Sequence, residues 1–417
     1  MTDVSPSLWR NRDFNLMWVG HGLSLLGTTM SSLAMRLMVL WLTGSAVWAG
    51  AVGTVSLVVM LVVGPVAGVI ADRADRRALL LGSDIALMAG FALLGTLIAV
   101  GHCSIGVVLA VTVVDGVCSG IYNGAVFPAL RNIAGKEHMK EATARTEARG
   151  HVISLVGPPL GGVAYGLGRV VPFFADAVSY LFSITALLLI RTPFQERVPT
   201  TRVESSPLAD FRAGFAYLVG SPFLRAVILI AAPLNFSFNG VLFGIVVVLR
   251  NAGVSPPLIG LTDTIFAGGG LLGALLSMRL LRRFGVTTLV RVICVAGVPL
   301  FLAILLLPLN PVIVLPVALL VIVSPPLNAG LFGHVSETVP DELQGRVYSA
   351  ILTSTMAFSA LAPLVVGTLV HHWGATGMVI AVAAAQSVSA VTALTSKGIR
   401  ELDAQSAMSA ESVAPSS

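Results

Sequence analysis

Residues 64–77 read GPVAGVIADRADRR, and this stretch changes from apolar to charged at Asp72. Two aspartates and three arginines fall within the six residues 72–77, and apolar residues resume from Ala78. Such a change is typical of a short polar turn between two helices that cross a membrane. The prediction of the fold therefore depends on whether the apolar runs on both sides of this turn are long enough to span a bilayer.

The composition of the whole chain indicates a membrane protein. Of its 417 residues, 56% are hydrophobic and 11% are charged, with a mean hydropathy of +0.91, whereas soluble proteins carry about 25% charged residues. The net charge of +5 does not indicate nucleic-acid binding, because the basic residues occupy short gaps between apolar runs without interleaved aromatic residues. The three cysteines are scattered without metal-ligand spacing, so we predict no metal site.

Twelve apolar runs are long enough to cross a membrane, since a span needs about 20 residues. We therefore predict an all-α integral membrane protein with twelve transmembrane helices in two six-helix halves. The runs are 14–42, 46–71, 78–101, 104–131, 148–168, 171–191, 222–249, 256–280, 286–307, 311–336, 347–370 and 373–395.

The basic residues predict how the chain is oriented in the membrane. With the N-terminus inside, the outer gaps carry only Arg169 and Arg250 near helix ends, and most other basic residues lie inside. This asymmetry places both termini in the cytoplasm of a multi-pass protein of the cell membrane. The predicted parts are a cytoplasmic N-terminus (1–13), an N-terminal six-helix bundle (14–191), a cytoplasmic central loop (192–221), a C-terminal six-helix bundle (222–395) and a cytoplasmic disordered tail (396–417).

The two halves show a weak internal repeat. Gly64 and Gly68 align with Gly269 and Gly273 at a shift of 205 residues, and a basic turn follows each pair. Parallel six-helix repeats with a binding site between them are an architecture of transporters.

The charged turn resembles the signature of the major facilitator superfamily between its second and third helices: Gly, three residues, Asp, basic, any, Gly, basic, basic. Here Gly68, Asp72, Arg73, Arg76 and Arg77 match that pattern, and Asp75 stands where the pattern has glycine. The DRxDRR form is similar to the branch of drug:proton antiporters that contains the enterobactin exporter and the macrolide-efflux proteins. Further stretches resemble that branch, namely LWRNRDFNLMWVG at the start, LTGSA at 42–46, LADFRAGFAYLVGSPFLR at 208–225 and VPDELQGRVYSA at 339–350.

This resemblance implies that the charged turn is a conformational latch on the cytoplasmic side. Asp72 would meet the start of the eleventh helix near Arg346 and Tyr348. Asp84 lies inside the third span near its cytoplasmic end, and this position predicts a partner for the arginines of the turn, the alternative being a proton carrier. The alternative to the latch is a tight connection whose arginines only set the topology. Because topology needs no carboxylate, Asp72 favours the latch. The latch residues are Gly68, Asp72, Arg73, Arg76, Arg77 and Asp84.

A second stretch resembles the exporter motif of the fifth helix. Its GPxxGG core is matched by Gly157, Pro158, Gly161 and Gly162, but Ile153 occupies one expected glycine position. Glycine and proline in a membrane helix permit close helix contacts and a bend. The stretch is therefore either a site of tight packing or, as the resemblance implies, a pivot that also seals against proton leak.

Ionisable residues inside membrane spans are costly and by default mark a pathway. Asp115 lies near the midplane of the fourth span, about 16 Å from its start at 1.5 Å per residue. It is our first candidate for proton coupling, the alternative being a carboxyl group that stabilises the bundle. Asp176 and Asp263 are further proton-coupling candidates, or else carboxylates placed favourably at helix N-termini.

The substrate cavity has weaker signals. Arg36 is predicted to snorkel, to pair with Asp176 or Asp263, or to contact an anionic substrate. Polar and aromatic residues on the fourth and seventh spans are candidates for lining a cavity that accepts a bulky amphiphile, with helix packing as the alternative. These candidates are Tyr122, Asn123, Asn235, Phe238 and Asn239.

Together these features predict a proton-coupled secondary exporter of an amphipathic small molecule, such as a macrolide-like drug or a siderophore. No nucleotide-binding P-loop is present, so we predict neither a nucleotide nor another cofactor. The predicted partners are the substrate, protons and the lipid bilayer. The alternatives are an uptake carrier for a nutrient or lipid and a non-transporting sensor. An enzyme is disfavoured, because the sequence contains neither HExxH nor GxSxG.

Overall fold

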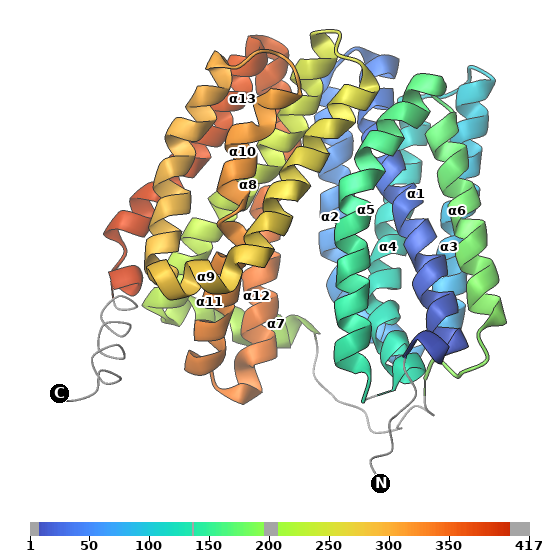
Figure 1. Ribbon diagram of the computed structural model, residues 1–417, viewed down its shortest axis with the longest axis horizontal. Coiled ribbons are helices and arrows are strands. Elements are labelled where there is room, and N and C mark those ends of the chain that lie inside the picture. The colour runs from blue at the N-terminus through green and yellow to red at the C-terminus, as the bar shows by residue number, and fades with distance from the viewer. Residues whose placement is uncertain (1–7, 136, 196–206, 401–417) are drawn as a thin grey trace. The chain divides into compact units, whose positions relative to one another are not determined.

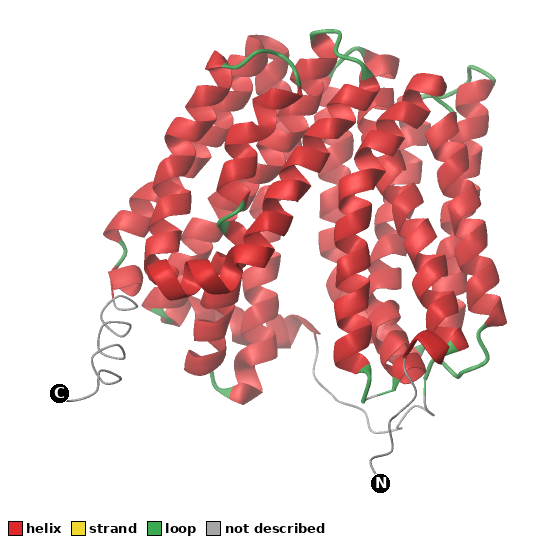
Figure 2. Ribbon diagram, viewed as in Figure 1, coloured by secondary structure: helices red, strands yellow, loops and turns green. Residues whose placement is uncertain are grey.

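The computed structural model describes residues 8–135, 137–195 and 207–400 (Figure 1). Every regular element in these ranges is a helix, as Figure 2 shows. The helices cluster into two compact units, which we call unit 1 (Met1–Val203 with Gly253–Thr264) and unit 2 (Glu204–Ala252 with Ile265–Ser417). The predicted all-α fold is confirmed.

Unit 1 is built on six long helices, α1 to α6. Within it α1 packs against α6 and α5, α2 against α4, and α3 against both α4 and α6. Its helices are a 3-10 turn at Leu8–Arg10, α1 (Arg12–Thr43), α2 (Ala46–Arg73), α3 (Arg76–Ala99), α4 (Ile105–Ala134), α5 (Met139–Leu167) and α6 (Val171–Leu189).

Unit 2 is organised around α8, along which α13 packs, while α12 packs against α7 and α8. Its elements are α7 (Pro207–Gly220), α8 (Pro222–Asn251), α9 (Pro256–Ala303), α10 (Leu315–Val321), α11 (Ser324–Thr338), α12 (Asp341–Ser359) and α13 (Ala362–Thr395), with 3-10 turns at Ile304–Leu306 and Pro311–Val314. The first turns of α9, up to Thr264, belong to unit 1.

Nine stretches of the residues that the structure describes are long and apolar enough to cross a membrane. Two of them, Pro256–Leu306 and Leu343–Thr395, contain 51 and 53 residues, more than twice the about 20 that one span needs. The helix in each is interrupted at a glycine with positive φ, Gly285 at 67° and Gly374 at 57°. The membrane-spanning fold is confirmed, and the number of twelve spans stays a prediction.

The predicted central loop, 192–221, contains a helix over its second part. Helix α7 begins at Pro207, which is suited to the first helical turn, and its buried face includes Leu218. Gly214 lets α7 approach α12 closely, since a β-carbon there would meet the backbone of Arg346 and Val347. The tertiary contact with α12 therefore turns part of a long connection into helix.

The close contact between α2 and α4 does not depend on Gly64. Gly64 is exposed, and a β-carbon added there would meet nothing within 4 Å. The close approach of α2 and α4 uses glycines of α4 instead: β-carbons on Gly116 and Gly120 would lie 2.7 Å from Val59 Cγ1 and 2.8 Å from Val63 Cγ1. The small residues that bring these helices together thus lie on the partner helix.

The aspartate that replaces glycine in the charged turn has a structural role. Asp75 is the N-cap residue of α3, and its carboxylate accepts a hydrogen bond of 2.8 Å from the backbone N–H of Ala78. A carboxylate at this position satisfies one of the free N–H groups of the first turn and interacts favourably with the helix dipole. The turn therefore starts α3 directly after α2 ends.

Asp75→Ala is expected to destabilise the protein by about 1 kcal/mol, because the cap is lost. Asp75→Ser, which keeps a side-chain acceptor, is expected to lose less than half of that. Thermal unfolding of the purified variants measures the difference. Equal midpoints for the two variants would contradict a capping role.

Candidate functional site

Helices α1 and α6 meet along a row of polar residues, which we call the polar seam. On α6 these residues recur at intervals of three and four, which places them on one face of the helix. They are almost completely buried, and α1 presents hydroxyl groups to them. The polar seam consists of Ser24, Thr28 and Ser31 of α1 and Asp176, Ser179, Tyr180 and Ser183 of α6.

Asp176 is the enclosed carboxyl group of the polar seam, with no exposed surface. Ser31 Oγ donates to its Oδ2 at 2.5 Å, and Ser179 Oγ lies 3.2 Å from its Oδ1. At Gly27 a β-carbon would collide with both Ser179 and Asp176, so glycine is required there. The first turn of α6 contains no acidic residue, so the expectation of a helix-end carboxylate is wrong for Asp176, which instead ties α6 to α1.

Tyr180 connects the polar seam to the other carboxyl groups of unit 1. Its hydroxyl lies 2.9 Å from Thr28 Oγ1, and Asp176, Asp115 and Asp84 all act on it electrostatically. Asp115, on α4, is half-buried, and its Oδ1 accepts a hydrogen bond of 3.3 Å from Ser119 Oγ. Two of the three predicted proton-coupling residues, Asp115 and Asp176, are therefore brought together.

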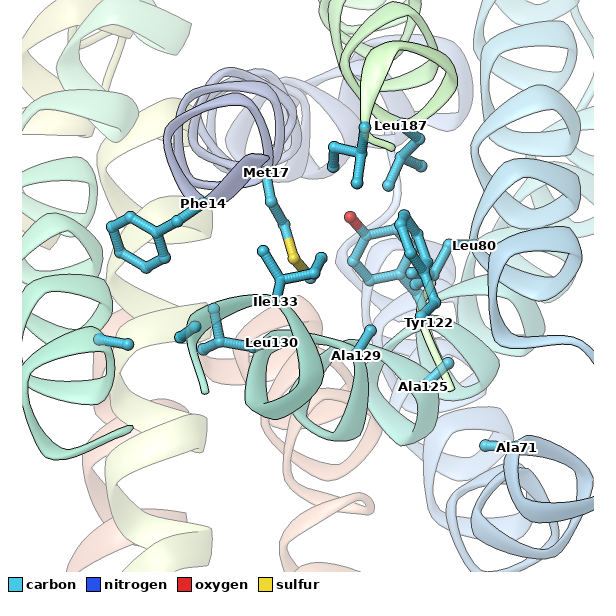
Figure 3. Close-up of a cluster of buried hydrophobic side chains, with 14 of the residues drawn as sticks. Phe14, Met17, Ala71, Leu80, Tyr122, Ala125, Ala129, Leu130, Ile133 and Leu187 are labelled. Atoms are coloured by element: carbon cyan, nitrogen blue, oxygen red, sulfur yellow. The ribbon is translucent and has the colours of Figure 1, made fainter. Parts of the chain in front are cut away.

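A second group of side chains, which we call the buried polar cluster, consists of His21, Asp84, Tyr122 and Arg149. The imidazole of His21 stacks on the Tyr122 ring with centroids 5.1 Å apart. Among the residues that the structure describes, no hydrogen bond reaches the two Asp84 oxygens, the Tyr122 hydroxyl, His21 Nδ1 or Arg149 Nε. Tyr122 lies among Leu80, Leu187 and Met17 (Figure 3), so it is enclosed by apolar side chains and does not line an open cavity as expected.

Asp84 does not pair with Arg77 as expected. Arg77 Nη2 donates to three carbonyl oxygens at the end of α6, those of Leu187, Leu188 and Ile190, at 2.7–2.9 Å. The last carbonyl groups of a helix have no partner within it, so they are free to accept hydrogen bonds from this guanidinium. Arg77 therefore fixes the end of α6.

The other latch residues lie at the end of α2 and the start of α3. Arg76 Nε donates to the carbonyl oxygen of Ala71 at 3.3 Å, and Arg73 is exposed. The side chains of Gly68 and Asp72 lie outside the described residues, so the predicted contact of Asp72 stays a prediction.

Arg36 pairs with Asp263 rather than with Asp176. Arg36 Nη2 lies 3.0 Å from Asp263 Oδ2, and the two side chains are 26% and 15% exposed. Asp263 is not in the first turn of α9, so a helix-end role is wrong for this residue as well. The pair joins α1 to the beginning of α9 within unit 1.

The helix-five motif forms a surface of close packing on α5. A β-carbon on Gly157 would lie 2.7 Å from Thr29 Cγ2, and one on Gly161 would lie 2.5 Å from the Met30 carbonyl oxygen of α1. Gly162 lies against the backbone of Pro256, and Gly260 lies against Pro158 in return. The motif residues thus hold α5 against α1 and against the first turns of α9.

In unit 2 the predicted cavity residues of α8 lie beside α12. Asn239 Nδ2 donates to Ser359 Oγ at 2.8 Å, and Ser359 Oγ approaches the Asn235 carbonyl oxygen at 3.3 Å. The rings of Phe238 and Phe266 pack edge to face, with their centroids 6.2 Å apart. Asn235, Phe238 and Asn239 are half-buried, so the three residues share a region with Ser359, which the sequence analysis did not identify.

Asn123 is exposed, in contrast to its buried neighbour Tyr122. A groove of about 550 Å³ lies between the start of α1 and α6, with Arg10, Arg12 and Phe182 among its lining residues. None of the predicted cavity residues lines this groove. Within the described ranges, no three His, Cys, Asp or Glu side chains form a group that would hold a metal ion.

The sequence analysis missed most of the polar seam. The α6 residues Asp176, Ser179, Tyr180 and Ser183 do carry a detectable signal, since they repeat at helical spacing inside an apolar run. Arg149, by contrast, lies just before the interior of the fifth predicted span, and nothing local to it indicates that it meets Trp18.

Comparison with known proteins places this arrangement among transporters. The sequence profile of the Major Facilitator Superfamily matches residues 17–363 and 226–406. The chain is 25% identical over 333 residues to the uncharacterized MFS-type transporter YfiS of Bacillus subtilis, covering 75% of this chain and 76% of that one. It is 22% identical to macrolide efflux protein A of Streptococcus pyogenes, covering 63% of this chain and 65% of that protein.

Two further similarities extend the comparison. The chain is 26% identical to the enterobactin exporter EntS of Citrobacter koseri, covering 64% of this chain and 63% of that protein. The matched region therefore spans slightly less than two thirds of both named exporters. Among solved structures, the nucleoside transporter NupG has a TM-score of 0.73 at 13% identity, covering 93% of this chain and 99% of that one. A likeness at that identity concerns the fold alone.

Proposed function

The chain belongs to the Major Facilitator Superfamily, and from that premise we propose that it exports an amphipathic small molecule in exchange for protons. As a member of this family it is a multi-pass membrane protein that transports a small-molecule substrate. The direction of transport, the coupling ion and the class of substrate are the proposed parts. Our proposal includes a cell-membrane location with both termini in the cytoplasm.

The observation that supports proton coupling is the environment of Asp115. It is half-buried, it accepts one weak hydrogen bond from Ser119, and it shares an electrostatic environment with Asp176 and Tyr180. Asp176, by comparison, is enclosed by Ser31 and Ser179, and Asp263 is occupied by Arg36. A proton carrier must be free to exchange its proton, and Asp115 has the weakest contacts of these three carboxyl groups.

Export is favoured by two similarities: to a macrolide efflux protein and to an enterobactin exporter. The substrates in both names, a macrolide and enterobactin, point to a bulky organic molecule. The half-buried Asn235, Phe238 and Asn239 offer amide and aromatic groups for such a ligand, next to Ser359. The likeness to a nucleoside transporter concerns the fold alone, so it does not favour uptake.

The remaining motifs have proposed roles in alternating access. Asp72 and the arginines of the charged turn act as the latch, and the helix-five motif acts as a pivot that also seals against proton leak. Transport proceeds by alternating access, as in other transporters with parallel repeats. The latch contributes only a few kcal/mol, since a two-state equilibrium must remain reversible.

Cells that carry the protein are expected to accumulate less of a macrolide or catecholate siderophore than cells without it, and a protonophore is expected to abolish the difference. Asp115→Asn should reduce export by at least tenfold, because the carboxyl group that exchanges the proton is removed. Ser119→Ala, which deletes only its hydrogen-bond donor, should retain most of the export. Export that persists in Asp115→Asn and resists the protonophore would refute the proposed coupling.

A further inference from the structure

The buried polar cluster contains an unusual carboxyl group. Asp84 is 1% exposed, and no described residue donates a hydrogen bond to either of its oxygens. The Ser183 hydroxyl lies close to both Asp84 and Tyr122 but makes no hydrogen bond of normal geometry to either. A carboxylate charge in such a place is very costly, whereas a neutral carboxyl group costs far less. The arrangement therefore fits the protonated form of Asp84.

Among the described residues, the cation Arg149 shares a neighbour, Tyr122, with Asp84. Tyr122 interacts electrostatically with both Asp84 and Arg149, and Arg149 also acts on His21. The titratable groups that interact with Asp84 from the helices packed against α3 are Cys118 and Tyr122 of α4 and Tyr180 of α6, and the other titratable or charged groups nearby are Asp115, Asp176, His21 and Arg149.

Arg149 lies near His21 and Tyr122 and is bound to Trp18. Its Nη1 donates to the Trp18 carbonyl oxygen and its guanidinium lies 5.5 Å from the Trp18 ring centroid, while its Nε has no hydrogen-bond partner among the described residues. The carbonyl group and the aromatic face stabilise the guanidinium charge without a carboxylate. The free Nε–H remains available to an anion.

We propose that Asp84 is a second proton-binding residue of this protein and that Arg149 is the counter-charge that balances Asp84 when the proton leaves. On release, the O–H bond of the carboxyl group breaks, the proton passes to water, and the net charge of the cluster falls by one unit. The Tyr122 and Ser183 hydroxyls then turn to donate to the carboxylate. The role of proton binding at Asp84 in the transport cycle rests on the proposed proton-coupled export.

Asp84 and Arg149 lie on different helices, α3 and α5. The other two residues of the buried polar cluster, His21 and Tyr122, lie on α1 and α4. Protonation and deprotonation change the attraction between these helices, because only the charged carboxylate attracts the guanidinium. An ionisable pair within a membrane has this effect at full strength, since little water screens it. Proton binding at Asp84 thereby alters the packing inside unit 1.

Infrared difference spectroscopy on the full-length protein in lipid nanodiscs tests the proposal without any substrate. The C=O stretch of a protonated carboxyl group is expected to appear at acid pH and to disappear at alkaline pH in the wild-type protein. Asp84→Asn should lose one component of this band, and Asp84→Glu should restore a component at a shifted frequency. Asp115→Asn should retain the Asp84 component. A band unchanged by Asp84→Asn in protein with a normal thermal midpoint would overturn the proposal.

The role of Arg149 has its own measurement. Arg149→Gln is expected to move the pH midpoint of the Asp84 component by about one unit or more, the usual effect of a nearby opposite charge. Arg131→Gln, which removes an exposed arginine at the end of α4, should leave that midpoint in place. Equal midpoints for all three proteins would overturn the counter-charge assignment.

The spectra separate this inference from the proposed function. If export resists a protonophore while the Asp84 component titrates, proton-coupled export is wrong and Asp84 remains a proton-binding residue. If export is proton-coupled but the band does not change in Asp84→Asn, the coupling stands and the assignment of Asp84 is wrong.

Discussion

Gly161→Ala is expected to destabilise the protein by about 1–3 kcal/mol, the usual cost of overpacking a close contact. The new β-carbon would lie 2.5 Å from the Met30 carbonyl oxygen and 2.8 Å from Met30 Cα. Both are backbone atoms of α1, so the collision cannot be relieved by a side-chain rotation. Helices α1 and α5 must separate, and export should fall with the loss of this contact.

A matched control lies on the same helix. Gly150→Ala places its β-carbon in open space, with nothing within 4 Å. Because alanine favours a helix over glycine by up to about 1 kcal/mol, this variant is expected to be as stable as the wild type or more so. Thermal unfolding of the purified proteins measures both changes. Equal effects of the two substitutions would show that the helix-five motif is not a site of close packing.

Removal of either member of the Arg36–Asp263 pair is expected to produce the second large effect. The pair is only 26% and 15% exposed, and loss of one partner leaves the other charge uncompensated in a poorly hydrated place. A fully buried pair would lose about 3–5 kcal/mol, and this partly hydrated one is expected to lose about 1–3 kcal/mol. Arg36→Gln and Asp263→Asn should each lower the thermal midpoint and the rate of export.

The double variant distinguishes a direct interaction from two separate defects. Arg36→Gln combined with Asp263→Asn should be less destabilised than the sum of the single variants, with a coupling energy within the range of about 0.5–3 kcal/mol. Arg169→Gln serves as a control, since Arg169 is exposed and stacks on Trp41, a contact worth about 0.5–1 kcal/mol. Strictly additive effects of the two single variants would contradict the ion pair.

The fold was largely predictable because each membrane span carries its own signal. An apolar run must satisfy its backbone hydrogen bonds internally, so hydropathy alone indicates a helix. Helix–helix contacts carry a weaker signal. The sequence shows that Gly64, Gly116 and Gly120 are small, yet it does not show that α2 and α4 meet on the α4 glycines. In the same way, a positive φ at Gly285 is a property of the folded chain.

The residues of the candidate site were predictable from the sequence, but the contacts between them were not. An ionisable residue in a span is conspicuous, so Arg36, Asp84, Asp115 and Asp176 could be selected from the sequence. Their partners lie far away along the chain: Arg36 meets Asp263 at a separation of 227 residues, and Ser31 meets Asp176 at 145. Such pairings depend on how whole helices are arranged, which a single sequence does not reveal.

The division of α9 between two units affects how chimeras of this chain can be designed. Its first turns, up to Thr264, pack with unit 1, and the rest of the helix belongs to unit 2. The boundary between the two packed units therefore does not coincide with the boundary between the two halves of the sequence. A chimera that joins the first half of one relative to the second half of another inherits a mismatched joint, unless Pro158 and Gly162 are exchanged together with Pro256 and Gly260. The glycine triplet 268–270 lies shortly after this boundary. Because glycine has a low helix propensity, a mismatch at the joint is expected to bend the helix there.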